Sequence, residues 1–82
     1  MKTALERAAR ALCSLDGNPE NAMMDGTPLW RDYVPEARAV LVAIREPHEV
    51  MRDAGEGISE GHRNDAVSMW HAMIDAALAD EK

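Results

Sequence analysis

Proline placement is the sequence feature that most limits how this chain can fold. The chain has four prolines, at positions 19, 28, 35 and 47. Proline breaks a helix interior, because it lacks a backbone donor and clashes with the preceding turn, but it suits the first turn of a helix. The prolines therefore predict several short segments, one ending at Asn18-Pro19 and others beginning at Pro28, Pro35 and Pro47.

The segment before the first proline predicts a capped helix. Thr3 followed by Glu6 is a capping-box sequence, in which each side chain satisfies a backbone donor of the other residue. Apolar side chains then recur at helical spacing, which predicts a helix over Ala4–Leu15. Gly17 suits the left-handed position beyond its end, and residues 16–27 are predicted to form a polar loop.

Four further helical segments follow this loop. Thr27-Pro28 predicts an N-cap and a first helical residue for a short helix that continues through Tyr33. Pro35 begins a helix that is predicted to reach Glu46, and Pro47 begins a short one that closes at Ala54-Gly55. Three glycines at positions 55, 57 and 61 predict a loop, after which Asn64 or Asp65 caps a last helix that continues to about Asp80.

The Pro35–Glu46 segment is apolar on nearly all sides, as expected of a central helix. Its run Ala39–Ile44 also suits a buried strand, but we find no second strand candidate in the sequence, so a helix is favoured. If this helix is central, replacing Leu41 or Ile44 by Ala should cost about 2–5 kcal/mol.

The last helix is predicted to pack through a wide apolar stripe, with Ser68, His71 and Asp75 on its opposite, solvated face. The stripe consists of Ala66, Val67, Met69, Trp70, Met73, Ile74, Ala77 and Leu78. We expect an all-α fold, a small helical bundle of three main helices plus one or two short helices, forming a single domain over residues 1–82. The three main helices are those over 4–15, 35–46 and 64–80, and their stripes should be buried together.

Composition limits the core and the partners of such a domain. Leu, Ile and Val together number fourteen and Phe is absent, which predicts a thin core packed with Ala and Met and favours a homodimer or higher homo-oligomer. The net charge of −6 disfavours direct binding to nucleic acid or to an anionic membrane, although an acidic protein can mimic nucleic acid. One cysteine, no apolar run long enough to span a membrane and no secretory leader predict a cytoplasmic location.

We find no reaction centre in the sequence and expect neither an enzyme nor a cofactor. The three histidines and Cys13 lack the short ligand spacings of a structural zinc site. The glycines of 55–61 miss the dinucleotide-binding spacing by one residue and follow a predicted helix rather than a strand. No serine or cysteine lies in a recognisable nucleophile motif.

The arginines carry the clearest candidate binding site. Every internal basic residue is Arg, the side chain suited to bidentate recognition of phosphate or carboxylate. Arg38 and Arg45 lie seven residues apart and so share a helix face, and Trp30 and Tyr33 just upstream could stack on a base. The alternatives are that these arginines pair with the surplus acidic residues and that Trp30 is a core anchor.

One set of segments has a distinctive order along the chain: residues 27–41 (TPLWRDYVPEARAVL), 44–47 (IREP), Met51, 54–55 (AG) and 70–76 (WHAMIDA). These segments resemble a group of small uncharacterised accessory proteins of bacteriophages and prophages in proteobacteria. The resemblance covers nearly the whole chain, from about residue 8 onward, except 57–65. No catalytic residues come with it. It implies a phage accessory product that acts by binding.

Three functions follow from these observations. The leading hypothesis is a non-catalytic phage-type protein that binds and inhibits a host or anti-phage defence protein, using its acidic surface to compete for a basic, nucleic-acid-binding face. The second is an oligomer that sequesters a nucleotide, with Arg38 and Arg45 on phosphate and Trp30 or Tyr33 on the base. The third is a minor role in phage morphogenesis.

Overall fold

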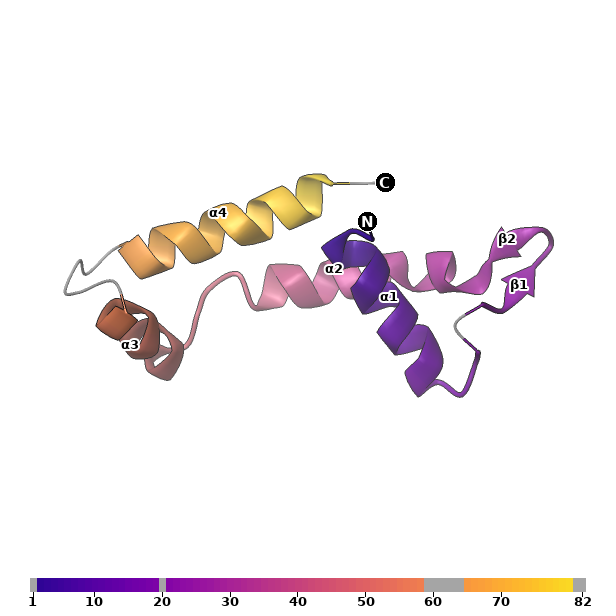
Figure 1. The fold of residues 1–82 in the computed structure, drawn as a ribbon, viewed down its shortest axis with the longest axis horizontal. Helices are drawn as coiled ribbons and strands as arrows, with labels where there is room; N and C mark the ends of the chain where they lie inside the picture. Colours follow the sequence, from indigo (N-terminus) through magenta and orange to yellow (C-terminus); the bar gives the residue numbers. More distant parts are fainter. Residues whose placement is uncertain (1, 20, 59–64, 81–82) are drawn as a thin grey trace.

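The computed structural model describes residues 2–19, 21–58 and 65–80, and it is mostly helical, as predicted. Figure 1 shows the order of the elements. They are α1 (Ala4–Leu15), β1 (Met23–Met24), β2 (Thr27–Pro28), the 3-10 helix η1 (Leu29–Tyr33), α2 (Val34–Ala43), α3 (Glu49–Ile58) and α4 (Asp65–Ala79). The predicted inventory of three main helices with one or two short ones is inexact, because α3 is as long as α2 and a small antiparallel sheet is present.

Helix α1 has the predicted bounds. The Thr3 hydroxyl accepts a hydrogen bond of 3.0 Å from the Glu6 backbone N–H, which is half of the predicted capping box. The Glu6 carboxylate instead accepts a hydrogen bond of 2.8 Å from Arg10, one turn later. Gly17 follows the helix with a φ of 89°, in the left-handed region where glycine carries no steric cost. The helix start and end are therefore fixed by the residues that the sequence indicated.

The loop predicted over residues 16–27 contains a β-hairpin. Met23 pairs with Pro28 and Met24 with Thr27, and the two residues between them, Asp25 and Gly26, have φ values of 52° and 80°. Two successive positive φ values fit the tight hairpin turn that Asp-Gly sequences favour. Thr27 and Pro28 therefore belong to β2, and the short helix begins after them at Leu29, so the predicted cap at Thr27 is wrong.

The bounds of the later helices differ from the prediction in three places, the end of α2 and both ends of α3, which begins at Glu49 rather than at the predicted Pro47. Helix α2 has Pro35 in its first turn but ends at Ala43, three residues before the predicted Glu46. Helix α3 continues through Gly55 and Gly57, which were expected in a loop. The third loop glycine, Gly61, and the predicted cap residue Asn64 lie outside the described residues, while α4 begins at Asp65 and ends close to the predicted position.

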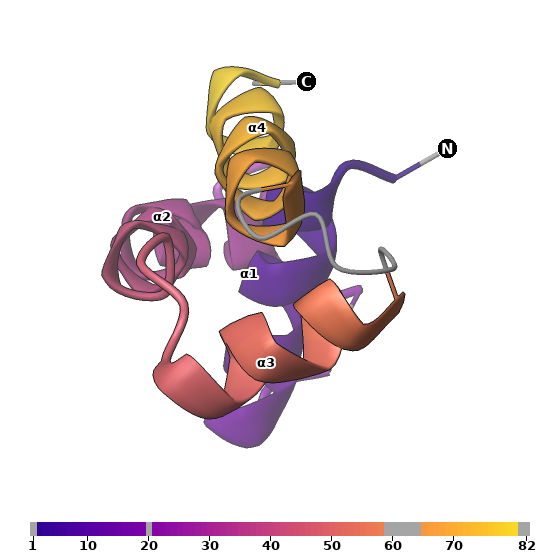
Figure 2. The ribbon, with the colours of Figure 1, turned by 90° about the vertical axis from the view of Figure 1, so that its left-hand side faces the viewer.

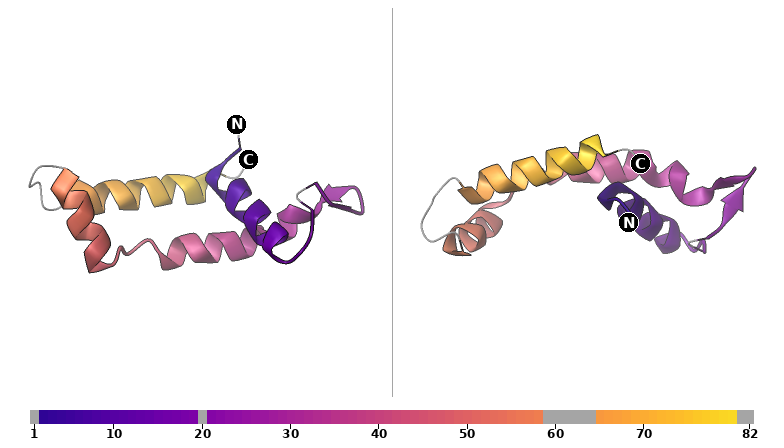
Figure 3. Two further views of the ribbon diagram at one scale, coloured as in Figure 1. Left: turned by 60° about the horizontal axis from the view of Figure 1, so that its bottom comes forward. Right: turned by 45° about the horizontal axis from the view of Figure 1, so that its top comes forward.

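The main core lies where α1 crosses η1 and α2. It consists of Leu5, Ala9, Cys13, Trp30 and Ala37, with partly buried neighbours around them. Helix α4 runs antiparallel beside α2 and α3 crosses the far end of this pair, so the helices outline an open frame (Figures 1 and 3). Ile74 of α4 is buried, but it is not a member of the main cluster. The prediction that three helices bury their stripes in one core is therefore wrong for α4.

The molecule is elongated, with extents of 51 × 22 × 20 Å and a radius of gyration of 15.6 Å. A compact domain of this length has a radius of gyration of about 12 Å. Figure 2 views the molecule from the α3 end and shows α2 and α4 end-on, as neighbouring helices. Val40, Val42 and Ile44 are 50%, 58% and 40% exposed, so α2 is not the buried central helix that its composition predicted.

Candidate functional site

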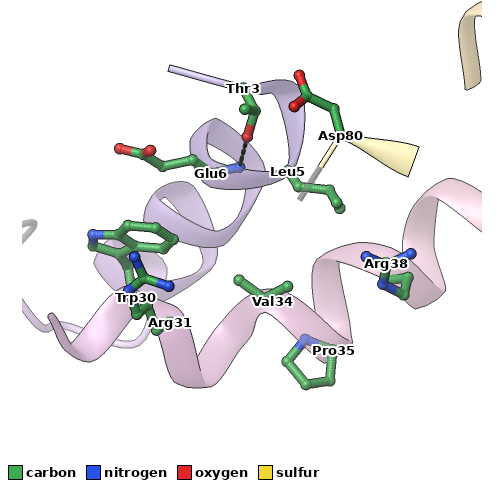
Figure 4. Close-up of a pocket in the computed structure, with 9 residues that line it drawn as sticks. All are labelled: Thr3, Leu5, Glu6, Trp30, Arg31, Val34, Pro35, Arg38 and Asp80. Carbon is green, nitrogen blue, oxygen red and sulfur yellow. Dashed lines mark hydrogen bonds between the residues drawn. The ribbon is translucent and has the colours of Figure 1, made fainter. Parts of the chain in front are cut away.

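A pocket of about 420 Å³ lies between the start of α1, the η1–α2 junction and the end of α4. Figure 4 shows its lining residues, which are Thr3, Leu5, Glu6, Trp30, Arg31, Val34, Pro35, Arg38 and Asp80. Of the four predicted site residues, the pocket brings together Trp30 and Arg38. Tyr33 and Arg45 are not among its lining residues. Two arginines and two carboxylates make the charged part of the lining balanced in sign.

Trp30 is a member of the main core. It is only 7% exposed, and the guanidinium carbons of Arg10 and Arg31 lie 5.2 and 5.1 Å from the centre of its ring. These distances are typical of cation–π contacts. A base that stacked on this ring would have to displace part of these contacts. The position of Trp30 therefore matches the alternative of a core anchor better than that of a stacking platform.

Tyr33 ties η1 to the segment that follows α1. Its hydroxyl donates a hydrogen bond of 2.8 Å to the Asp16 carboxylate and accepts one of 3.2 Å from the Asn18 amide. The hydrogen bond to Asp16 raises the pKa of Tyr33, because the bond holds the phenol proton and a phenolate would face a negative carboxylate. Tyr33 thus positions the loop, and its hydroxyl is engaged away from Arg38 and Arg45.

Arg38 lies on α2, whereas Arg45 lies two residues beyond the end of α2 at Ala43, so the two do not share a helix face as predicted, although both contact α4. Arg38 donates a hydrogen bond of 2.9 Å to the backbone carbonyl of Leu78 in the last turn of α4. A cation at this end of a helix is favoured by the partial negative charge of the unpaired carbonyls. Arg45 makes two hydrogen bonds to the two carboxylate oxygens of Asp75, of 2.7 and 3.0 Å. Arg38 therefore joins α2 to α4, and Arg45 joins the segment that follows α2 to α4.

The contact between Arg45 and Asp75 shifts the pKa of each group in the direction expected of an ion pair. The hydrogen bond from Arg45 holds the pKa of Asp75 below its ordinary value, and the Asp75 carboxylate raises the pKa of Arg45. The alternative that this arginine pairs with an acidic residue is thus what the structure shows. Two planar hydrogen bonds also fix the rotation of α4 about its own axis relative to α2.

Two further contacts at this junction were missed by sequence reasoning. The Trp70 indole N–H donates a hydrogen bond of 2.7 Å to the carbonyl of Ile44, just beyond the end of α2. The Nε2 atom of His71 lies 3.2 Å from a carboxylate oxygen of Glu46, although it is buried and without hydrogen-bond geometry among the described residues. The polar face of α4 with His71 and Asp75, expected in solvent, therefore faces α2.

The apolar side of α4 is correspondingly turned outwards. Met69 and Met73 are 53% and 65% exposed. Ala72 lies between them and Ala76 follows Met73, and both alanines are also exposed. Residues three and four apart share one side of a helix, so these four form a continuous strip, which we call the methionine face. Asp65 and Asp80 lie near its two ends and are exposed. The predicted stripe is therefore wrong for Met69 and Met73.

The structure gives no support to metal chemistry within the residues it describes. Among residues 2–19, 21–58 and 65–80, no group of three or more His, Cys, Asp or Glu side chains could hold a metal ion. Cys13 is a fully buried free thiol in the main core, which matches its place near the apolar stripe of α1. Across the same described segments, none of the helices has the length and apolar character needed to cross a membrane.

Comparison of the chain with protein-family models, with curated proteins and with solved structures gives no match. The similarity to small phage accessory proteins therefore depends on the sequence segments quoted above and stays an expectation.

Proposed function

We propose that this chain is a non-catalytic accessory protein of the phage type that binds and inhibits a host or anti-phage defence protein. The observation that carries the proposal is the methionine face of α4, an exposed apolar strip with an aspartate near each end. Such a strip is costly to leave in water, and apolar surface of this kind often marks a protein-binding site. The acidic ends and the net charge of −6 favour a basic partner.

Methionine is suited to such a face because its long, unbranched side chain adapts to the shape of a partner. Met69 and Met73 supply the apolar contact, while Asp65 and Asp80 can attract arginine or lysine side chains at the rim. A basic surface that normally binds nucleic acid offers these side chains. Binding of this protein there would exclude the nucleic acid, which is how an acidic mimic inhibits.

The pocket beside Trp30 supports a second candidate, the sequestration of a nucleotide. Arg31 and Arg38 line the pocket and could contact a phosphate, whereas Arg45 is held by Asp75 outside it. Glu6 and Asp80 also line the pocket and would repel the same phosphate. We therefore place protein binding first. A thermal-shift screen with mono-, di- and cyclic nucleotides tests the second candidate, and Arg31→Ala should abolish any shift that is found.

The leading proposal is tested by affinity capture from the bacterial host with the parent chain and with a Met69→Glu, Met73→Glu double variant. We expect one basic protein to be captured by the parent, to be released by added DNA, RNA or salt, and to be lost from the variant. Met23→Glu with Met24→Glu is the matched control, because these exposed methionines lie on the hairpin, far from α4. Equal capture by all three proteins, or capture that is insensitive to nucleic acid and salt, would overturn the proposal.

The morphogenesis hypothesis makes a different prediction. A structural component should be detected in purified phage particles, whereas an inhibitor of a host protein should be found in the infected cell. Analysis of the particles by mass spectrometry separates these two hypotheses without knowledge of the target.

A further inference from the structure

An aliphatic groove lies between α1 and α2. It has a volume of about 380 Å³, and the described residues that line it are Ala8, Ala11, Leu12, Leu15, Ala37 and Val40. Leu15 is 82% exposed and Val40 50% exposed, so the two larger side chains at its rim are in contact with water. The small side chains along its length would let a second helix approach closely.

Helix α3 has an apolar side that its own chain leaves uncovered. Val50 and Ile58 are 71% and 86% exposed, and Ala54 between them is also exposed. These residues are spaced by four, so they form one row along the helix. The side of α3 that meets α4 adjoins this row, and there Gly55 lies against Ala66. Helix α3 is thus strongly amphipathic, and only part of its apolar side contacts the rest of its own chain.

The row on α3 matches the groove in length and in chemistry. The groove follows α1 from Ala8 to Leu15, and the row extends from Val50 to Ile58, so each covers about 10–12 Å at 1.5 Å per residue. Both surfaces are aliphatic. In the structure α3 lies at the end of the α2–α4 pair, where it contacts α4 rather than the groove of its own chain (Figure 1).

The charges beside the two surfaces are complementary. Arg7 is exposed on α1, one turn before Ala11, and its side chain has no hydrogen-bond or ion-pair partner among residues 2–19, 21–58 and 65–80. Glu49 and Asp53 are exposed on α3, one turn apart and next to its apolar row. Two acidic side chains on the inserted helix and one arginine beside the groove would favour this pairing over an uncharged helix.

We propose that the groove binds α3 of a second copy of this chain, and that the two copies exchange these contacts reciprocally in a closed dimer. The same chain supplies both the groove and the helix, so two equivalent contacts form about a two-fold axis. Each contact covers aliphatic side chains of α1, α2 and α3 that one copy alone exposes. The methionine face of α4 takes no part in the dimer, so this inference is independent of the proposed inhibition of a partner.

The test is the oligomeric state of the full chain, measured by size-exclusion chromatography with light scattering. We expect the parent to be a dimer, and Val40→Glu and Ile58→Glu each to be monomers with unchanged helical circular dichroism, since both side chains are largely exposed. A one-to-one mixture of the two variants should recover a dimer at higher protein concentration, because the Val40→Glu chain keeps an intact α3 and the Ile58→Glu chain keeps an intact groove.

Each other outcome overturns the proposal. A monomeric parent would show that the groove is free or is filled within one chain. A dimer that survives either substitution would place the interface elsewhere, and the absence of recovery in the mixture would exclude insertion of α3 into the groove. Met69→Glu with Met73→Glu is the matched control and should stay a dimer.

Reversal of the charges gives a second readout of the same contact. Arg7→Glu should raise the dimer dissociation constant by up to about 25-fold, because the dimer contains this contact twice and each exposed ion pair contributes up to about five-fold. Adding Glu49→Arg and Asp53→Arg to that variant should restore the parent value. An unchanged dissociation constant in Arg7→Glu, or a further loss in the combined variant, would show that Arg7 does not face α3.

Discussion

Arg45 and Asp75 are joined by two hydrogen bonds, of 2.7 and 3.0 Å, although Arg45 lies just beyond the end of α2, Asp75 lies on α4 and they are 30 residues apart in the sequence. The same junction contains the Arg38 bond to the Leu78 carbonyl and the Trp70 bond to the Ile44 carbonyl. Helix α4 is therefore attached to α2 largely by directed polar contacts. Ile74 is the buried apolar residue of α4, whereas Met69 and Met73 of the methionine face stay exposed.

The first prediction concerns the stability of the fold at acidic pH. Because Arg45 lowers the pKa of Asp75, the pair stabilises the fold above the ordinary carboxyl pKa of 3.8, and this contribution is lost as the pH falls through the lowered value. The melting temperature of Asp75→Asn should thus lie below that of the parent at neutral pH, and the difference should shrink below pH 3.8. Asp32→Asn, whose residue is exposed on η1, is the control. A difference that is constant with pH would contradict the pairing.

The second prediction concerns the single tyrosine, which can be titrated without ambiguity by its ultraviolet absorbance. Hydrogen bonding to Asp16 raises the pKa of Tyr33 above its ordinary value of 10.0. Its contribution to stability is therefore present below pH 10.0 and is lost as the pH rises through the raised value. Asp16→Asn should bring the titration midpoint down towards 10.0. If the midpoint is the same in both proteins, Tyr33 does not donate to this carboxylate.

The third prediction separates the core of α1 from its surface. Leu5 is 3% exposed in the main core, so Leu5→Ala should lower the free energy of unfolding by about 2–5 kcal/mol. Leu15 on the same helix is 82% exposed, and Leu15→Ala should change the free energy of unfolding by less than about 0.5 kcal/mol. Urea unfolding at a protein concentration low enough to keep the chains apart measures both. Similar losses in the two variants would mean that α1 packs on a different side.

The sequence predicted local structure well where the signals were local. Thr3, Gly17 and Pro35 act through their own backbone neighbours, and the bounds of α1 and the start of α2 follow from them. The hairpin had an equally local signal in Asp25-Gly26, a pair typical of two-residue β-turns, and a search for such pairs would have found it.

Burial could not be predicted in the same way, because periodicity shows that a helix has an apolar side without showing what covers it. Helix α4 has a polar side and an apolar side, and either could pack against a neighbouring helix. The contact of Arg45 with Asp75 turns the polar side towards α2. The candidate site illustrates the same limit. The spacing predicted one helix face for Arg38 and Arg45, but α2 ends before Arg45, and their partners on α4 lie 40 and 30 residues further on, which spacing does not show.

The last prediction concerns the two glycines inside α3, which have different surroundings. A Cβ atom added at Gly55 would lie 2.7 Å from the Cβ of Ala66 on α4, closer than two carbon atoms can approach. At Gly57 it would meet no atom within 4 Å among the described residues. Ala66 cannot rotate away, because its Cβ is fixed by the backbone. Helices α3 and α4 would therefore have to separate in Gly55→Ala.

Gly57→Ala should raise the free energy of unfolding by about 0.4–1 kcal/mol, since alanine restricts the unfolded chain and suits a helix. Gly55→Ala should lower it by about 1–3 kcal/mol, the range for an overpacked contact. Adding Ala66→Gly to Gly55→Ala removes the clash and should recover much of this loss, apart from the lower helix propensity of glycine in α4. Urea unfolding of the four proteins measures these differences. Equal stabilisation by both glycine substitutions, or no recovery on adding Ala66→Gly, would show that α3 does not pack on α4 at Gly55.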